Sequence, residues 1–160
     1  MKIIEYKKEY ENEVKEMLTE LQNHIIKIDK YKLNTITPEY KEEYFKFAYN
    51  LSYNNEGKFF IAIENNIILG FIACSVTQYE DFAKISYKCP KKGVITELFV
   101  KDLARKKGVA SLLIKKVEQY LKSISCEYIE LDVFASNINA YNLYKKHSFE
   151  DRVKVMFKKL

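Results

Sequence analysis

Apolar residues near the start of the chain recur at spacings of three and four, the pattern of helices that bury one face. The first such row consists of Val14, Leu18, Leu21, Ile25 and Ile28. It predicts a helix over residues 9–28. Thr37 and Pro38 favour the start of a second helix, with Thr37 as the capping residue and Pro38 in the first helical position. We expect this helix to continue to about Leu51.

Short apolar runs, several of them alternating with polar residues, predict strands at residues 2–6, 59–64, 67–78, 94–100, 128–134 and 152–158. Asn65 and Asn66 separate two of these runs and favour a hairpin turn, because Asn tolerates positive φ. Gly70 lies inside a strand and indicates a bulge or a close backbone approach. The region from 78 to 92 reads as a loop, with residues 84–87 as a possible brief strand.

The second half of the chain alternates strands with helices, which are predicted at residues 108–123 and 139–147. A strand–helix–strand run of this length implies a parallel pair with a right-handed crossover. The full order is strand, two helices, three strands, helix, strand, helix, strand. It predicts an α/β (α+β) fold with three layers, in which helices flank both faces of a mixed, mostly antiparallel sheet. No repeat or linker interrupts the pattern, so we expect residues 1–160 to form a single domain.

The composition excludes several classes of protein. At 48% hydrophobic and 14% aromatic residues, the chain is too apolar to be disordered. No run approaches the roughly 20 apolar residues of a membrane span, and charges follow the short apolar start too soon for a secretory signal. Cys74, Cys89 and Cys126 show neither a metal-ligand spacing nor a disulfide framework. We therefore expect a cytoplasmic protein that has no metal site and no membrane partner.

The net charge of +5 is concentrated in one stretch, because residues 101–122 hold seven basic and two acidic side chains and the remainder is neutral in sum. Arg105, Lys106 and Lys107 precede a predicted helix whose amino end already carries partial positive charge. A bound anion would relieve this repulsion, and Gly108 would let it approach the backbone. A solvated basic loop and a nucleic-acid-binding helix are the alternatives. Because the cations are confined to one loop and helix, they favour a single polyphosphate ligand. A nucleic-acid-binding protein usually spreads its cations over a wider surface.

Two blocks of residues carry a family resemblance. The first is Arg105-x-x-Gly108-x-Ala110, after a strand that ends Leu98-x-Val100. The second is Leu131-x-Val133-x-x-x-Asn137-x-x-Ala140-x-x-x-Tyr144-x-x-x-Ser148-Phe149. Together they span about a third of the chain. In this order and at this separation they resemble the GNAT-type N-acetyltransferase superfamily, in which Gly usually stands at the position of Ser148.

The resemblance implies an enzyme that transfers an acetyl group from acetyl-CoA directly to an amine within a ternary complex. Backbone groups of Leu98, Phe99 and Val100 would pair with the pantetheine arm, and the Asn137 amide would hydrogen-bond it. Backbone N–H groups after the basic loop would bind the pyrophosphate. The residues of that stretch are Arg105, Lys106, Lys107, Gly108, Val109, Ala110 and Ser111.

Two side chains are candidates for proton transfer. Tyr144 matches the family's usual general acid, since a phenol with a pKa near ~10 stays protonated at neutral pH and can donate to a thiolate. Its alternative is a core tyrosine on a helix face. Glu97 is the candidate base, acting directly or through water. Its alternative is a strand-edge carboxylate in a surface ion pair.

The acceptor is predicted to be a small primary amine, because residues 29–53 and 78–92 combine Tyr and Phe with acids that attract cations. The acids are Asp29, Glu39, Glu42, Glu43, Glu80 and Asp81. The tyrosines of this region either pack or line a substrate pocket. A protein or peptide amino group is an alternative acceptor, and a CoA-binding module without catalysis is an alternative function. No nucleic-acid partner is expected, and a homodimer is left open.

Overall fold

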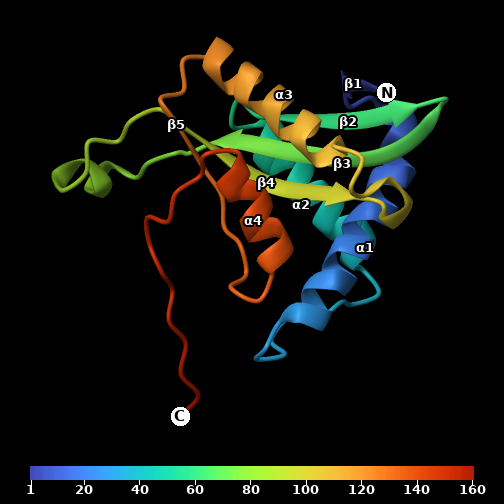
Figure 1. Ribbon diagram of the computed structural model, residues 1–160. Helices are drawn as coiled ribbons and strands as arrows, with labels where there is room; N and C mark the ends of the chain where they lie inside the picture. Colours follow the sequence, from blue (N-terminus) through green and yellow to red (C-terminus); the bar gives the residue numbers. More distant parts are fainter.

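The computed structural model describes all 160 residues, which form one five-stranded sheet with helices on both faces (Figure 1). The strands, in sheet order, are β1 (Lys2–Glu5), β2 (Lys58–Glu64), β3 (Ile67–Val76), β4 (Lys92–Val100) and β5 (Tyr128–Glu130). The helices are α1 (Glu11–Ile28), α2 (Tyr40–Tyr53), α3 (Val109–Ser123) and α4 (Ile138–Lys146), with short 3-10 turns η1 (Lys8–Tyr10), η2 (Asp81–Ile85) and η3 (Asp102–Ala104). Only β4 and β5 pair in parallel. The predicted mixed, mostly antiparallel α/β fold is confirmed.

Each face of the sheet has its own apolar core. Successive residues of a strand point to opposite faces, so Phe59 of β2 packs against α1 and α2 while Phe60 packs against α3. On the α3 side, five helix residues at three- and four-residue spacing are buried, namely Val109, Leu113, Ile114, Val117 and Leu121. Burial of each such side chain contributes about 1.5–3 kcal/mol. None of the helices is both long and apolar enough to cross a membrane.

Two local predictions in the β2–β3 hairpin are confirmed. Asn65 and Asn66 both have positive φ, 49° and 62°, as a two-residue hairpin turn requires. Gly70 lies opposite Val100 of β4, and a Cβ at this glycine would come within 2.5 Å of the Phe99 carbonyl oxygen. The glycine therefore permits close contact between β3 and the strand that carries the candidate site.

The expected start of the second helix is wrong in detail. The helix begins at Tyr40, its capping position is Glu39, and no side chain caps it. The carbonyl of Thr37, not its hydroxyl, contacts the helix start by accepting the Tyr40 N–H at 3.1 Å. Residues 37–39 thus form a turn that precedes the helix. The possible brief strand at residues 84–87 is also wrong, because residues 81–85 form the exposed turn η2.

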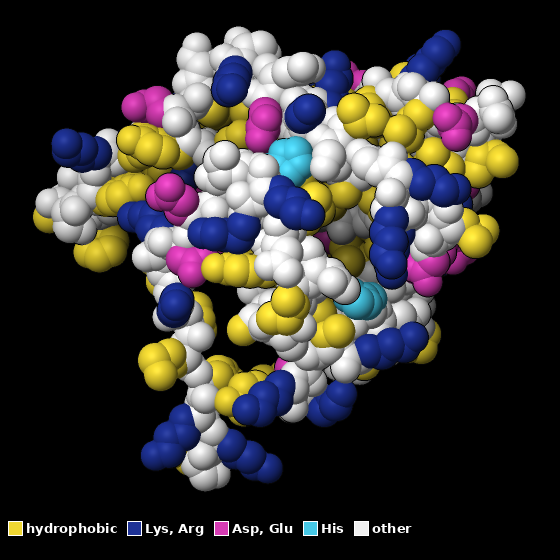
Figure 2. Space-filling view, in the orientation of Figure 1, with side chains coloured by type: hydrophobic (Ala, Val, Ile, Leu, Met, Phe, Trp, Pro, Cys, Tyr) yellow, Lys and Arg dark blue, Asp and Glu magenta, His cyan; other side chains and the backbone are white.

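The C-terminal part of the chain departs most from expectation. The strand predicted over residues 128–134 ends at Glu130, and the strand predicted over residues 152–158 does not form. Residues 152–158 make no backbone–backbone hydrogen bond, and Figure 2 shows open space between this end of the chain and the body of the molecule. Its far end is held where the Tyr31 hydroxyl donates to the Phe157 carbonyl at 2.7 Å. Alternation identified a strand-forming segment, but a strand also needs a partner edge of sufficient length, and β5 at the edge of the sheet has only three residues.

Candidate active site

The candidate site lies where β4 and β5 part. The two strands pair only from Lys92 and Tyr128 to Val94 and Glu130. Beyond this point β4 continues to Val100 with its β5-side edge free, while the chain after β5 turns away (Figure 1). Every second residue of this stretch directs its backbone N–H and C=O groups toward the free edge. These groups can pair with an extended ligand, as when a peptide adds to the edge of a sheet. Leu98, Phe99 and Val100, predicted to pair with the pantetheine arm, lie on this open stretch.

A β-bulge on β4 determines where Glu97 points. Ala73 of β3 lies opposite Glu97 and Cys74 lies opposite Ile95, so Thr96 is an extra residue in β4. Without the bulge, Ile95 and Glu97 would face the same side of the sheet. Instead Ile95 packs in the α3-side core and Glu97 faces α2. The inserted residue thus turns the carboxyl toward the face that the second helix covers.

Glu97 is buried, with 9% of its surface exposed, and it accepts a hydrogen bond of 2.6 Å from the Tyr44 hydroxyl of α2. Burial raises the pKa of Glu97 to about 7, while the bond from Tyr44 acts in the opposite direction. The Tyr40 ring stacks on Tyr44 with centroids 4.7 Å apart. The surface ion pair considered for Glu97 is absent, since no cation lies within salt-bridge distance. The site therefore holds a carboxyl that titrates near neutral pH.

Tyr144 lies on α4, half-buried, with its ring edge-on to Phe149 at 5.8 Å. Burial, and then the charge of Glu97, raise the pKa of Tyr144 to about 12. Its hydroxyl forms no hydrogen bond within the protein and is not fully buried. The phenol therefore stays protonated at neutral pH and has a proton available for a ligand.

The amino end of α3 has the features of an anion site. Gly108 occupies the capping position with φ 80°, and a Cβ built there would meet no atom within 4 Å. No side chain caps the helix. The first N–H groups of a helix have no partner within it, and here they belong to Val109, Ala110 and Ser111. Open space, free donors and a left-handed glycine coincide at the predicted pyrophosphate site.

The three cations before this helix have different environments. Arg105 folds back, because its Nε donates to the Val100 carbonyl at 3.2 Å and its guanidinium pairs with Asp102 at 2.8 Å. It ties the basic loop to the end of β4. Lys106 and Lys107 are exposed and form no ion pair. Their charge is therefore available to an anion, whereas that of Arg105 is partly used within the loop.

Asn137 and Ser111 are also engaged within the protein. Asn137 caps α4, where its Oδ1 accepts the Ala140 N–H at 3.2 Å, so its amide N–H groups remain for a ligand. Ser111 Oγ lies 2.9 Å from His147 Nε2, which joins α3 to α4. Of the contacts at the site, Tyr44 is the one that sequence reasoning missed, although the tyrosines of α2 had been considered as pocket residues.

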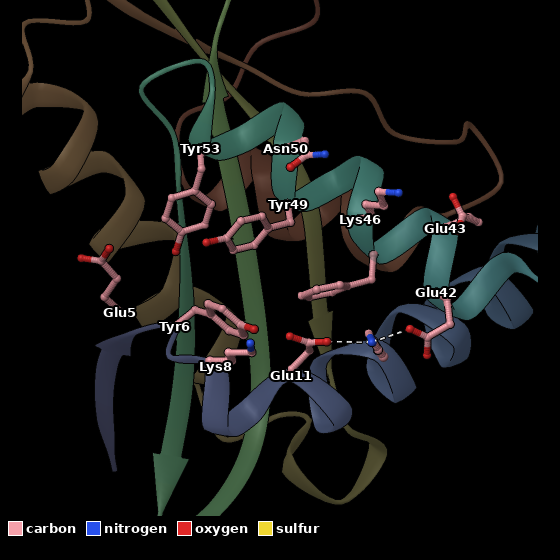
Figure 3. Close-up of a pocket in the computed structure, with 12 residues that line it drawn as sticks. Glu5, Tyr6, Lys8, Glu11, Glu42, Glu43, Lys46, Tyr49, Asn50 and Tyr53 are labelled. Carbon is pink, nitrogen blue, oxygen red and sulfur yellow. Dashed lines mark hydrogen bonds and ion pairs between the residues drawn. The ribbon is translucent and has the colours of Figure 1, made fainter.

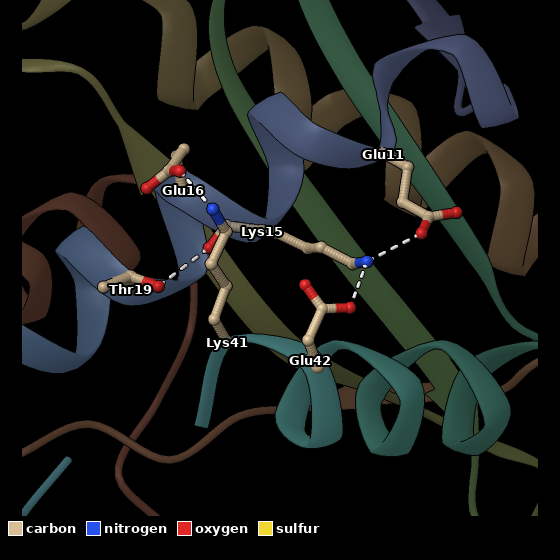
Figure 4. Close-up of polar contacts among 6 residues, drawn as sticks. All are labelled: Glu11, Lys15, Glu16, Thr19, Lys41 and Glu42. Carbon is tan, nitrogen blue, oxygen red and sulfur yellow. Dashed lines mark hydrogen bonds and ion pairs between the residues drawn. The ribbon is translucent and has the colours of Figure 1, made fainter. Parts of the chain in front are cut away.

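A separate groove of about 570 Å³ lies between α1 and α2 (Figure 3). Its lining residues include Tyr6, Tyr49 and Tyr53 but neither Glu97 nor Tyr144. At its edge Lys15 Nζ lies 2.8 Å from Glu11 and 2.5 Å from Glu42, which joins the two helices (Figure 4). The groove is therefore distinct from the candidate site.

Two of the acids predicted to attract an amine are used elsewhere in the fold. Glu42 pairs with Lys15, as described above. The Asp29 carboxylate accepts the side-chain amide of Asn34 and the backbone N–H groups of Asn34, Tyr31 and Leu33, which lowers its pKa to about 2 and fixes the loop after α1. These contacts leave Glu97 as the buried carboxyl beside the open edge of β4.

Comparisons with known proteins agree with this geometry. Residues 18–149 match the family described as the acetyltransferase (GNAT) family. An N-alpha-acetyltransferase of Sulfurisphaera tokodaii is 29% identical over 98% of this chain and 90% of its own length. An uncharacterised N-acetyltransferase of Methanocaldococcus jannaschii is 30% identical over 68% of this chain. The match covers less than half, 45%, of the length of that protein.

Solved structures share the fold at lower identity. A Bacillus halodurans protein matches 100% of this chain and 99% of its own with a TM-score of 0.83 and 19% identity. An aminoglycoside N-acetyltransferase crystallised with CoA matches 99% of this chain and 98% of its own with a TM-score of 0.69 and 18% identity. The predicted GNAT-type fold and N-acetyltransferase class are confirmed at the level of the family. This chain belongs to the acetyltransferase (GNAT) family.

Proposed function

We propose that this protein transfers the acetyl group of acetyl-CoA directly to a primary amine while both substrates are bound. The observation that carries the proposal is the Glu97 carboxyl, buried beside the open edge of β4 and held by Tyr44 at 2.6 Å. Its pKa of about 7 makes it a base at physiological pH. Family membership and the CoA complex of a similarly folded enzyme support acetyl-CoA as the donor.

The chain offers a continuous path for the donor. The amino end of α3, with Gly108 and the free cations Lys106 and Lys107, would bind the pyrophosphate. The free edge of β4 at residues 98–100 would pair with the pantetheine arm, and the Asn137 amide would donate to it. The thioester would then lie between Glu97 on β4 and Tyr144 on α4.

The reaction moves three protons. Glu97, as the carboxylate, removes one from the ammonium form of the acceptor, directly or through a water. The neutral nitrogen attacks the thioester carbonyl and the C–N bond forms. As the C–S bond breaks, the Tyr144 hydroxyl donates its proton to the leaving thiolate, and its raised pKa ensures that the proton is present. The attacking nitrogen loses its second proton through water to the Tyr144 phenolate, and Glu97 releases its own to solvent. Acetylated amine, CoA thiol and one proton are the products.

The strength of the base favours an acceptor with an α-amino group. Such amines have pKa values of about 7.7–8.0, close to that of Glu97, whereas a lysine-type amine at about 10.4 is a much poorer proton donor to it. Amino termini of peptides and proteins are amines of this kind. The α-amino group of a free amino acid is more basic, because its own carboxylate stabilises the ammonium form. This comparison therefore favours the polypeptide acceptor, in keeping with relatives described as N-alpha-acetyltransferases. The small primary amine predicted from sequence is the second candidate.

An acetylation screen tests the proposal. Purified protein and acetyl-CoA would be incubated with amino acids, polyamines, aminoglycosides, peptides with free amino termini, and lysine peptides with blocked ones. Thiol release and product mass are the readouts, with Glu97→Gln as the control variant. We expect acetylated α-amines in the parent and loss of transfer in the variant. Stabilisation by CoA without transfer to any amine would instead indicate a non-catalytic CoA-binding module.

Other expectations remain predictions. We propose that residues 1–160 form a single domain, since one sheet joins both cores. No group of three His, Cys, Asp or Glu side chains is placed to hold a metal ion. The metal-free reaction, the cytoplasmic location and the lack of a nucleic-acid partner are predictions that biochemical work must test.

A further inference from the structure

One face of the sheet is covered only in part. The apolar core between the sheet and helices α1 and α2 includes residues of β2 and β3, but it takes only Phe99 from β4 and no residue from β5. The first half of β4, residues 92–96, and β5 therefore lie outside this core. Glu97, which faces α2, marks the boundary between the covered and the uncovered part of the face.

Lys92, at the start of β4, faces the same side of the sheet as Glu97. Gly93 faces α3, since a Cβ built on this glycine would come within 2.3 Å of Leu121. Successive residues of a strand point to opposite faces, so the Lys92 side chain is directed away from α3. The uncovered face therefore has a carboxyl at one end of β4 and a cation at the other.

Lys92 belongs to a cluster in which two cations share one carboxylate. Its Nζ lies 2.8 Å from Glu130 Oε2, and Arg152 Nη1 lies 3.9 Å from the same oxygen. The Lys92 ammonium also lies over the Tyr79 ring, and the Arg152 guanidinium lies over the Tyr87 ring. Neither cation has a second carboxylate partner, so the cluster carries one uncompensated positive charge.

Hydrogen-bonding capacity is also unused on this face. Thr77 donates its backbone N–H to the Lys92 carbonyl at 2.8 Å, so it lies opposite Lys92 on β3 and faces the same side. Its hydroxyl oxygen is buried without a hydrogen-bond partner, and so are the hydroxyl oxygens of Tyr79 and Thr96. Buried polar groups normally have partners, so a polar ligand or water is expected here.

We propose that Lys92 and Arg152 bind an acidic residue near the amino terminus of a polypeptide acceptor whose α-amino group lies at Glu97. This inference rests on the proposed function, because it names the acceptor of that same site. The uncompensated charge of the cluster is complementary to a carboxylate, and the Glu97 carboxyl is complementary to an ammonium group. The acceptor would thus be held at both ends of the uncovered face.

The spacing of the two ends indicates where the acidic residue lies in the acceptor. Glu97 is opposite Ala73 on β3, and Lys92 is opposite Thr77, four residues further along that strand. This separation corresponds to about 13 Å, because a strand advances about 3.3 Å per residue. An extended peptide with its amino group at Glu97 would reach the cluster at about its third to fifth residue. A small amine is too short to contact both ends.

Peptides that differ only in charge test the inference. Three acceptors would share their first two residues and carry Glu, Gln or Lys at the third, fourth and fifth positions. We expect kcat/KM to be about tenfold higher for the Glu peptide than for the Gln peptide, mainly through KM, since the charge pair is partly exposed. The Lys peptide should be the poorest acceptor. Added salt should reduce these differences, because it screens exposed charges.

Two adjacent lysines provide matched variants. Lys92→Gln should remove most of the preference for the Glu peptide. Lys91→Gln is the control and should keep the preference, because Lys91 pairs with Glu56 at 2.7 Å and not with the cluster. Arg152→Glu should reverse the preference in favour of the Lys peptide, a result that misfolding cannot produce. The Arg152 side chain is 65% exposed, so this change should leave the fold intact.

A binding measurement separates this inference from the proposed chemistry. The Glu and Lys peptides, labelled at their carboxyl termini, would be titrated with the CoA-saturated protein and followed by fluorescence anisotropy. We expect tighter binding of the Glu peptide by the parent and of the Lys peptide by Arg152→Glu. Equal binding and equal kcat/KM of the peptides, or transfer to small amines alone, would overturn the acidic acceptor and leave acetyl transfer standing. Preferential binding of the Glu peptide without transfer to any amine would instead refute the proposed function and retain this site.

Discussion

Replacement of Tyr44 by Phe tests the candidate base. The phenol donates the only hydrogen bond that the Glu97 carboxylate receives from the protein, and phenylalanine keeps the ring that stacks on Tyr40. Removing the donor disfavours the charged carboxylate. We therefore expect the pKa of Glu97, now about 7, to rise in Tyr44→Phe.

The size of the effect follows from the type of bond. A hydrogen bond to a charged group contributes about 1.5–3 kcal/mol, equivalent to roughly one to two pH units in the pKa. At pH 7 about half of Glu97 is ionised in the parent, and about 1–10% would be ionised in the variant. Turnover at pH 7 should fall about 5- to 50-fold and recover as the pH approaches 9, because the acid limb of the profile moves upward.

Two measurements check the reasoning. The pH profile of kcat/KM, with an acceptor from the screen, should show the displaced acid limb in Tyr44→Phe but not in Tyr40→Phe, since Tyr40 makes no hydrogen bond to Glu97. Carbon-13 NMR titration of the Glu97 carboxyl, compared with Glu97→Gln to assign the signal, reports the same pKa without any substrate. An unchanged carboxyl pKa in Tyr44→Phe would refute the role given to the tyrosine.

Four other changes have defined outcomes. Urea titrations should show that Glu97→Gln is about 3 kcal/mol more stable than the parent at pH 8 and equally stable at pH 4. The pKa of Glu97 is about 7 in the folded protein and 4.5 when unperturbed, so ionisation of Glu97 makes the parent less stable as the pH rises from 4 to 8, whereas glutamine does not ionise. Gly108→Asp should abolish the rise in melting temperature that CoA produces, whereas Gly108→Ala, with similar strain at φ 80°, should retain part of it by calorimetry. Tyr144→Phe should lower turnover at least tenfold with CoA affinity nearly intact, and parental turnover would make this tyrosine structural only. Ser148→Gly should stabilise the fold by roughly 1 kcal/mol, since Ser148 has φ 62°, and a lower melting temperature would contradict this.

Local rules predicted most of the fold. Rows of apolar residues located all four helices, and the pair Asn65–Asn66 located the hairpin turn. Ser148, at the position where the resembled family usually has glycine, has a positive φ of 62°. These features depend on short segments of chain, whose periodicity and turn chemistry are visible in sequence. The prediction that Thr37 caps the second helix failed because several neighbouring residues within one turn can start a helix.

The site was predictable only in part. The cations of the basic loop repel the positive amino end of the following helix, and a bound anion would relieve this repulsion. The structure has open space at Gly108, where such an anion would lie. The contact between Tyr44 and Glu97 joins positions 53 residues apart. It also depends on the bulge at Thr96, which reverses the face of every later residue in β4. No periodicity in the sequence reveals an extra residue of this kind, since it becomes visible only when β4 is aligned with β3.

The strand predicted at residues 152–158 has a different explanation. Alternation in a segment reflects burial of one face, and within a single copy this segment buries neither face. Four large apolar side chains exposed on seven residues cost solubility and gain nothing in an isolated chain. β5, the strand at the edge of the sheet, is only three residues long, so it offers a seven-residue segment too few backbone partners for a further row of strand pairing. The prediction failed because alternation reports the tendency of the segment itself and carries no information on the length of the edge beside which it would have to pair.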